Sequence, residues 1–207
     1  MNVMSEIIIE NAIKYIGDLF QDNTDGHDIN HSLRVYNNAM NIAAAYSSCD
    51  KMVVALAALL HDVDDHKLFH TVNNENARKF LSSQDIEQEK IDLICNLINS
   101  VSFSKNRGNT PECIEGKIVQ DADRLDAIGA IGIARTFAYG GKNGRTLNLS
   151  VQHFYDKLLL LKYEMNTKEA KEIANNRHSF MEMFLNELDK ELKTENADLS
   201  QILIPNP

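Results

Sequence analysis

Apolar residues recur every three or four positions along most of the chain, a spacing that predicts amphipathic helices. Near the start, one such pattern runs over Ile7–Leu19 and a second over Leu33–Tyr46. Further helical patterns cover, approximately, residues 51–60, 74–81, 85–101, 112–137, 151–163 and 167–192. Alternation with a period of two residues, the pattern of a half-buried strand, is not sustained. The chain is therefore predicted to be an all-α, single-domain helical bundle over residues 1–207.

Two segments between these patterns lack helical spacing and are rich in glycine, asparagine and basic residues: Ser102–Pro111 and Tyr139–Ser150. Both are predicted to be loops, and long loops in a compact domain are often functional. The pattern over 112–137 is expected to break near Gly129 or Gly132, because glycine is a poor helix former. Asp50 lies two positions before the apolar run that starts at Met52 and is a candidate for a helix N-cap.

The balance of charged residues narrows the classes of partner. The chain has 207 residues with 21 Lys+Arg against 30 Asp+Glu, a formal net charge of −9. Such a charge repels nucleic-acid backbones and anionic membranes, so neither is an expected partner. A phosphorylated substrate has to be attracted by a local cation, and a bound metal ion is the expected one. The oligomeric state is left open, a homodimer included.

Cysteine usage and the absence of targeting signals indicate a compartment. The three cysteines form no CxxC pair, which argues against a zinc knuckle or a dithiol redox motif. Residues 1–10 lack the basic and apolar regions of a signal peptide, and the chain has no apolar run of the length of a membrane span. A reduced, cytoplasmic protein is expected.

Candidate chemistry is concentrated in histidine and aspartate. His61 and Asp62 directly follow the apolar run Val53–Leu60. Ionisable side chains at the end of a buried helix need a partner, because an unpaired buried charge is very costly. That partner is either a divalent cation or a lysine or arginine, and the residues alone leave both open.

A second group of acidic residues lies on the predicted helix over 112–137. Asp121 has Lys117 and Arg124 within one helical turn, so it is the better candidate for structural ion pairing. Asp123 has Val119 and Asp126 among its neighbours on the helix, a largely apolar face without a cation. Asp123 is therefore the predicted metal-binding carboxylate of this segment.

These residues occur in a recognisable order. His31 with Arg34-Val35, then His61-Asp62, then Ala122-Asp123-Arg124-Leu125 give the order H…HD…D in helical surroundings. The set resembles the HD-domain superfamily of metal-dependent phosphohydrolases. The strings GHDINH (26–31), LLHD (59–62) and QDADRLDAIGAIGIARTF (120–137) are similar to a bacterial subgroup of small, single-domain HD hydrolases. The best-studied type of that subgroup is a nucleoside-triphosphate pyrophosphohydrolase. The resemblance covers residues 26–145, and the helices over 151–192 read as a generic bundle.

The resemblance implies a metal site and an enzymatic activity. Its metal ligands correspond to His31, His61, Asp62 and Asp123. Imidazole and carboxylate together suit Mn²⁺, Mg²⁺, Co²⁺, Ni²⁺ or Fe²⁺, and Mn²⁺ is the first expectation. In many members an acidic residue three positions after the HD aspartate helps to position the attacking water, which here corresponds to Asp65 as the catalytic residue.

The role of Asp65 in proton transfer is not decided by the residues. Asp64 is adjacent and also acidic, and His66 stands where some relatives have another carboxylate. The family mechanism is attack of a metal-activated water on a phosphoryl group.

Basic side chains are needed to hold the remaining phosphate charge. The candidates lie near the metal motif and in the two predicted loops: Lys67, Lys105, Arg107, Lys142 and Arg145. A solvated surface position is an equally good reading of each. Arg34 and Arg124 are expected to pair with nearby carboxylates, although either has the chemistry to face the cleft.

The leading functional hypothesis is hydrolysis of a (d)NTP to a (d)NMP and pyrophosphate. A 5′-nucleotidase or a hydrolase of guanosine tetraphosphate is the alternative within the superfamily. The cyclic-dinucleotide branch is disfavoured because the chain reads HDVDD after Leu60 and lacks that branch's HDxGK pattern. A different class, a helical protein that binds metal or nucleotide without catalysis, predicts metal-dependent melting without turnover. A nucleic-acid-binding module is opposed by the net charge and by the absence of tryptophan and of a basic stripe.

Overall fold

The computed structural model describes residues 3–21, 29–66, 68–101 and 109–195, and the regular elements in these ranges are all helical. This confirms the prediction of an all-α fold. The chain divides into two compact units, one of residues 1–126 with 165–170 and one of residues 127–164 with 171–207. None of the described helices is both long and apolar enough to be a candidate membrane span.

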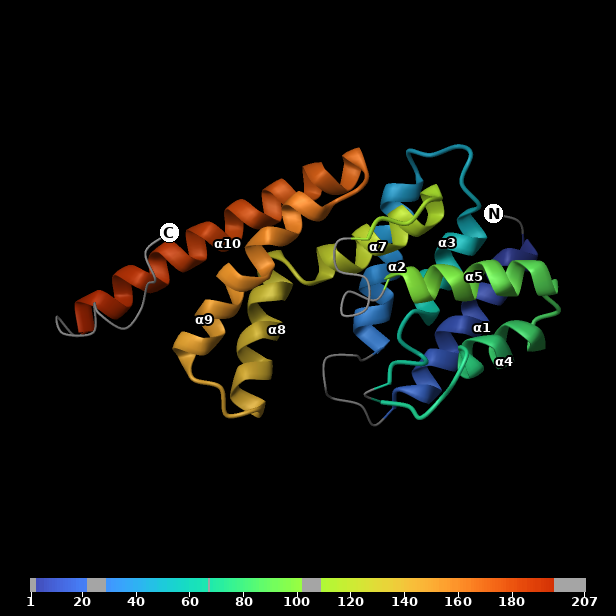
Figure 1. Cartoon of the computed structure of the whole chain (residues 1–207), viewed down its shortest axis with the longest axis horizontal. Helices are drawn as coiled ribbons and strands as arrows, with labels where there is room; N and C mark the ends of the chain where they lie inside the picture. Colours follow the sequence, from blue (N-terminus) through green and yellow to red (C-terminus); the bar gives the residue numbers. More distant parts are fainter. Residues whose placement is uncertain (1–2, 22–28, 67, 102–108, 196–207) are drawn as a thin grey trace. The chain divides into compact units, whose positions relative to one another are not determined.

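The first unit is built around a buried central helix. Its helices are α1 (Val3–Leu19), α2 (Ile29–Ala43), α3 (Lys51–Leu60), α4 (Glu75–Ser83), α5 (Gln88–Val101) and α7 (Ile114–Asp126). Every residue of α3 from Val53 to Leu60 is buried, and α3 packs against α1, α2, α5 and α7 (Figure 1). The continuous apolar run of α3 is therefore explained by contacts on all sides, and α2 also packs directly against α7.

Two aspartates accept hydrogen bonds from backbone N–H groups at the starts of helices in this unit. Asp50 is the N-cap of α3 as predicted, and its carboxylate accepts hydrogen bonds from the backbone N–H groups of Met52 and Val53. Asp64 accepts hydrogen bonds from the backbone N–H groups of Asn76 and Ala77, both at 3.0 Å, in the first turn of α4. Both carboxylates thus satisfy backbone donors that a helix start leaves without partners.

The second unit contains α8 (Gly129–Lys142), α9 (Leu147–Asp156), the 3₁₀ helix η1 (Leu158–Glu164) and α10 (Lys168–Glu195) from residue 171 onward. Three aromatic rings from α8, α9 and α10 meet in its interior, with ring centroids 5.8–6.5 Å apart: Phe137, Phe154 and Phe184. Phe154 is fully buried, so this cluster joins the three helices.

The helix pattern of the sequence is largely confirmed, with corrections at the connections. The pattern over 112–137 does break, and α8 begins at Gly129, whose φ is +77°. The prediction of a loop over Tyr139–Ser150 is wrong for most of its length, because α8 continues to Lys142 and α9 begins at Leu147. The pattern over 151–163 is likewise divided between α9 and η1. Of the other predicted loop, residues 102–108 lie outside the described residues.

Candidate metal centre

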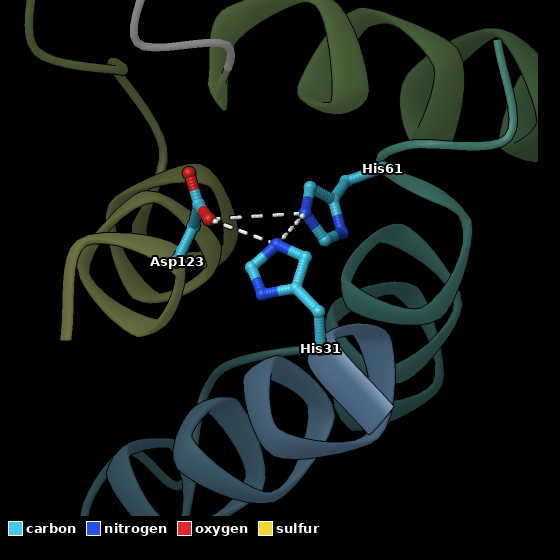
Figure 2. A group of neighbouring side chains, drawn as sticks. All are labelled: His31, His61 and Asp123. Atoms are coloured by element: carbon cyan, nitrogen blue, oxygen red, sulfur yellow. Dashed lines mark hydrogen bonds and ion pairs between the residues drawn. The ribbon is translucent and has the colours of Figure 1, made fainter. Parts of the chain in front are cut away.

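Three side chains from three helices converge at one point of the first unit. His31 lies in the first turn of α2, His61 directly follows α3, and Asp123 lies on α7. The Nε2 atoms of the two histidines are 3.2 Å apart. An oxygen of Asp123 lies 3.5 Å from His31 Nε2 and 3.8 Å from His61 Nε2 (Figure 2). One ligand atom from each of these residues lies within 4.8 Å of the others, which makes them a group able to hold a metal ion.

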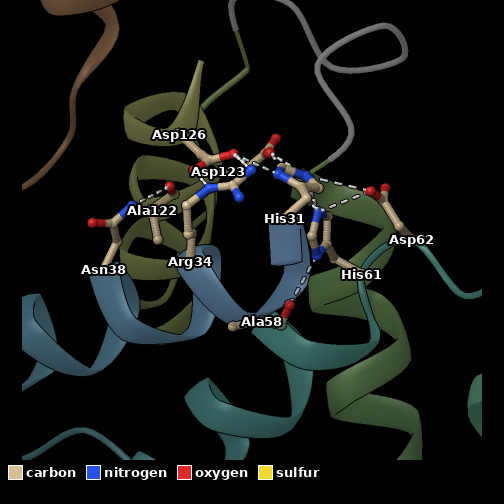
Figure 3. Close-up of polar contacts among 9 residues, drawn as sticks. All are labelled: His31, Arg34, Asn38, Ala58, His61, Asp62, Ala122, Asp123 and Asp126. Carbon is tan, nitrogen blue, oxygen red and sulfur yellow. Dashed lines mark hydrogen bonds and ion pairs between the residues drawn. The ribbon is translucent and has the colours of Figure 1, made fainter. Parts of the chain in front are cut away.

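Asp62 contacts the same two nitrogen atoms. Its Oδ2 lies 3.4 Å from His31 Nε2 and 3.3 Å from His61 Nε2. In Figure 3, Asp62 and Asp123 lie on opposite sides of the histidine pair. The structure therefore brings together all four residues that the family resemblance implies as ligands, with a histidine pair in the middle and a carboxylate on either side.

A hydrogen bond to the backbone fixes the tautomer of His61 whose unprotonated nitrogen faces this point. Its Nδ1 lies 2.8 Å from the backbone carbonyl oxygen of Ala58. A carbonyl oxygen only accepts, so Nδ1 carries the proton and donates. In the neutral imidazole the proton on Nδ1 leaves a lone pair on Nε2, the atom that faces His31 and the carboxylates.

His31 is almost fully buried and surrounded by carboxylates. Its Nδ1 lies 2.7 Å from Oδ2 of Asp126, one turn after Asp123 on α7. Burial alone lowers the pKa of His31, but the carboxylates of Asp126, Asp62 and Asp123 outweigh it and raise the pKa to about 9. Two carboxylates and a second imidazole at Nε2 thus create a strong demand for positive charge at this atom.

The donor set fits a divalent cation. Neighbouring ligands of an octahedral ion with bonds of about 2.1 Å lie about 3 Å apart. The separations around the two Nε2 atoms are 3.2–3.8 Å, close to that value. Two imidazole nitrogens with carboxylate oxygens suit first-row divalent ions and Mg²⁺. The histidines also donate their other N–H groups to oxygen atoms, as metal-binding histidines commonly do.

Asp121, two positions before Asp123 on α7, does not face the candidate metal centre. Asp121 is fully buried and points away to residues 166–167, where its carboxylate accepts hydrogen bonds from the backbone N–H groups of Asn166 at 2.8 Å and Thr167 at 2.7 Å. The expected structural role is thus supported, but the hydrogen-bond partners are these groups and the side chains of the same two residues, rather than Lys117. Burial raises the pKa of Asp121, against the effect of those hydrogen bonds and of the positive charge of Arg124, the other predicted partner.

Asp65 and the basic candidates are placed only in part. Asp65 lies in the turn after His61-Asp62, with its backbone N–H donating to the Asp62 carbonyl at 3.0 Å. Arg145 lies over the ring of Tyr139 in the second unit, 5.2 Å from its centroid, and Lys142 is exposed at the end of α8. Three further candidates lie outside the described residues: Lys67, Lys105 and Arg107.

The sequence did not single out one side chain that contacts a candidate ligand, and it did not give the exact partner of another. Asp126 stood out only as a neighbour of Asp123, yet it contacts both His31 and Arg34. Arg34 pairs with a carboxylate as expected, but that carboxylate is on another helix. A usable signal was present: Arg34 follows His31 by three positions, and Asp126 follows Asp123 by three, so each pair shares a helix face.

Comparison with known proteins finds relatives that match this chain over most of its length. The HD domain model matches residues 28–128, which contain the described cluster. The YpgQ protein of Bacillus subtilis is 40% identical over 195 residues, covering 90% of this chain and 94% of that protein. A crystal structure of YpgQ in complex with ADP superposes with a TM-score of 0.81 at 35% identity, covering 91% of this chain and 97% of that one. An HD-superfamily hydrolase from Bacillus thuringiensis gives a TM-score of 0.78 at 37% identity, covering 91% and 98%. The chain therefore belongs to the HD domain family and has the fold of the HD-superfamily hydrolases.

Proposed function

We propose that this protein is a metal-dependent phosphohydrolase of nucleotides that converts a (d)NTP to a (d)NMP and pyrophosphate. The observation that carries the proposal is the convergence of His31, His61, Asp62 and Asp123 with both Nε2 atoms facing one point. These four residues would hold the ion, with Mn²⁺ as the first candidate. Nucleotide as the substrate class is supported by the ADP complex of YpgQ.

A divalent cation at such a site lowers the pKa of water toward neutrality and polarises a phosphoryl oxygen. The chain itself must then provide orientation, proton transfer and charge for the remaining phosphates. Asp62 and Asp123 bring two negative charges, and the whole chain is at −9, so a phosphate group is repelled unless positive charge compensates it. Lys67, Lys105, Arg107, Lys142 and Arg145 stay candidates for that compensation.

Asp65 is the proposed proton acceptor for the attacking water. The structure supports this choice over Asp64, because both oxygens of Asp64 accept backbone hydrogen bonds at the start of α4. The side chain of Asp65 is 18% exposed, and the exposed side chain of His66 lies 3.8 Å from it. A carboxylate beside the metal motif with access to solvent has the position that a general base needs.

The test is product analysis on the full chain after treatment with a chelator, with and without Mn²⁺. The substrates are NTPs, dNTPs, nucleoside monophosphates and guanosine tetraphosphate. Pyrophosphate from triphosphates, dependent on Mn²⁺, supports the proposal, and orthophosphate from monophosphates supports a 5′-nucleotidase instead. Binding of Mn²⁺ without turnover of any substrate contradicts an enzymatic function.

The matched variants for the proton-transfer role are Asp65→Asn and Asp64→Asn. Asp65→Asn is expected to lower kcat by roughly 10²–10⁴-fold while the melting temperature stays near that of the wild type. Asp64→Asn removes part of the cap of α4 and is expected to lower the melting temperature with kcat within a few-fold of the wild type. The reverse pattern would assign the catalytic role to Asp64.

A further inference from the structure

A buried carboxylate lies directly behind the candidate ligand His31. The side chain of Asp126 is 2% exposed, and its Oδ2 lies 2.7 Å from His31 Nδ1, on the side of the ring away from Nε2. Asp123 and Asp126 are one turn apart on α7. The same helix therefore supplies a candidate ligand and the carboxylate that contacts another ligand from behind.

Asp126 is in turn held by an arginine from α2. Arg34 Nε lies 2.6 Å from Asp126 Oδ1, and Arg34 Nη2 lies 3.1 Å from Oδ2. This is a two-pronged pairing, which fixes the plane of a carboxylate as well as its position. His31 and Arg34 are one turn apart on α2, just as Asp123 and Asp126 are on α7 (Figure 3). Each helix thus contributes one residue to the candidate centre and one residue to the pair behind it.

The chemistry of these contacts determines which nitrogen of His31 is available. An ionised carboxylate only accepts, so Asp126 keeps a proton on Nδ1 and leaves Nε2 for a cation. The hydrogen bond also stops rotation of the ring, and the guanidinium of Arg34 stops rotation of the carboxylate. Because the guanidinium offsets the charge of Asp126, the pair orients His31 without adding a third net negative charge to the centre.

We infer that Asp126 and Arg34 are positioning residues for the metal ligand His31 and set the affinity of the centre for its cation. The inference rests on the proposed metal-dependent function and adds to it two residues that do not themselves contact the ion. A purely structural role, a link between α2 and α7, would change the stability of the fold and leave the affinity for metal unchanged.

The experiment measures Mn²⁺ affinity by calorimetric titration of the full chain, freed of metal by a chelator. Asp126→Asn has nearly the shape of the native side chain. Since Arg34 Nε donates at Oδ1, the amide nitrogen of the substitution faces His31 and favours the tautomer with its proton on Nε2. Loss of an outer contact of this kind typically weakens metal binding by about 10–100-fold, and this is the expected result. Arg34→Gln, at a one-third exposed side chain, is expected to weaken it by about 10-fold.

Two further variants separate positioning from stability. Asp126→Glu retains the carboxylate and is expected to recover part of the affinity lost in Asp126→Asn. Asp121→Asn is the matched control, because Asp121 is also buried on α7 and hydrogen-bonded, but to residues 166–167. It is expected to lower the melting temperature of the metal-free protein while Mn²⁺ affinity stays within about two-fold.

The outcomes distinguish this inference from the proposed function. Folded Asp126→Asn that binds Mn²⁺ as tightly as the wild type overturns the inference and leaves the proposed function intact. Equal losses of affinity in Asp126→Asn and Asp121→Asn also overturn it, since they indicate a general effect of destabilising α7. A wild-type protein that binds no Mn²⁺, Mg²⁺ or Co²⁺ overturns the proposed function itself, and this inference with it.

Discussion

Replacing Asp121 with alanine tests whether its carboxylate supports the fold rather than the metal. The side chain is fully buried and joins α7 to the segment before α10. Its two oxygens accept four hydrogen bonds, two from the backbone N–H groups of Asn166 and Thr167 and two from the side chains of the same residues. Alanine has no acceptor to replace them.

The magnitude follows from the donors that lose their acceptor. Both backbone N–H groups and the Thr167 hydroxyl are left without Asp121, whereas the Asn166 amide retains Gln120 Oε1 at 2.9 Å. A buried donor without a partner costs about 1–3 kcal/mol. Because burial raises the pKa of Asp121, its charge is itself costly, and the loss falls toward the lower end of that range. We expect Asp121→Ala to lower the free energy of unfolding by about 3–5 kcal/mol.

The assay is urea unfolding followed by circular dichroism, with thermal melting alongside it. At about 2–4 °C per kcal/mol for a chain of this size, the melting temperature should fall by roughly 6–20 °C. The folded variant should still bind Mn²⁺, because Asp123, not Asp121, faces the two histidines. A change of less than about 1 kcal/mol, or loss of Mn²⁺ by folded Asp121→Ala, refutes this reasoning.

Three further predictions concern other parts of the molecule. Asp50→Ala should lower the free energy of unfolding by about 1 kcal/mol, because α3 loses its N-cap. Burial raises the pKa of Asp50, but its hydrogen bonds with Lys90, Val53 and Met52 outweigh this effect and lower the pKa. The contribution of Asp50 is therefore present above its unfolded pKa of about 3.8 and lost as the pH falls through the lowered value, so the wild type and Asp50→Ala should converge in acid urea titrations. Gly132→Ala should destabilise the fold by about 1–3 kcal/mol or more, since its Cβ would lie 2.2 Å from the Ala127 carbonyl oxygen. In the same thermal melting experiments Gly141→Ala should be neutral or stabilising, because an added Cβ there meets nothing within 4 Å. Mn²⁺ should raise the melting temperature of the wild type in proportion to the logarithm of its concentration, and a flat response of the wild type, or an equal rise for Asp123→Ala, would contradict the ligand assignment.

The helices were predictable from the spacing of apolar residues. The loop predicted over Tyr139–Ser150 was wrong because glycine was taken as a sign of irregular structure. The helix α8 continues through Gly140 and Gly141, residues of low helix propensity that favoured a loop. At Gly140 an added Cβ would lie 2.5 Å from Ser150 Oγ, so glycine is required there by a close contact. The start of α9 has an ordinary signal, Thr146, whose side chain accepts a hydrogen bond from Leu149 N–H. A tertiary contact therefore explains the glycine at position 140, and the Thr146 cap marks the start of α9.

Three of the four candidate ligands had a local reason in the sequence, whereas His31 was assigned through the family resemblance. His61 and Asp62 follow a wholly apolar helix, and Asp123 lies on a helix face without a neighbouring cation. The partners of Asp121 were not accessible, since Asn166 and Thr167 are 45 and 46 positions away and offer backbone groups. Spacing favoured Lys117 and Arg124 on the same helix, and the charge of Arg124 does act on the carboxylate, but its hydrogen bonds come from residues 166–167.

The Arg34–Asp126 pair behind His31 was predictable from the sequence only in part. Spacing places Arg34 on the face of His31 and Asp126 on the face of Asp123, so each helix by itself indicates that a second polar residue accompanies the ligand. Neither helix indicates that the two faces meet, because that depends on α2 packing against α7. Once His31 and Asp123 are taken as ligands of one ion, their helices must approach each other at these two residues. The meeting of the residues three positions further along depends in addition on the direction in which the helices cross, which the sequence does not give. The structure shows that they do meet, with Arg34 Nε and Asp126 Oδ1 2.6 Å apart.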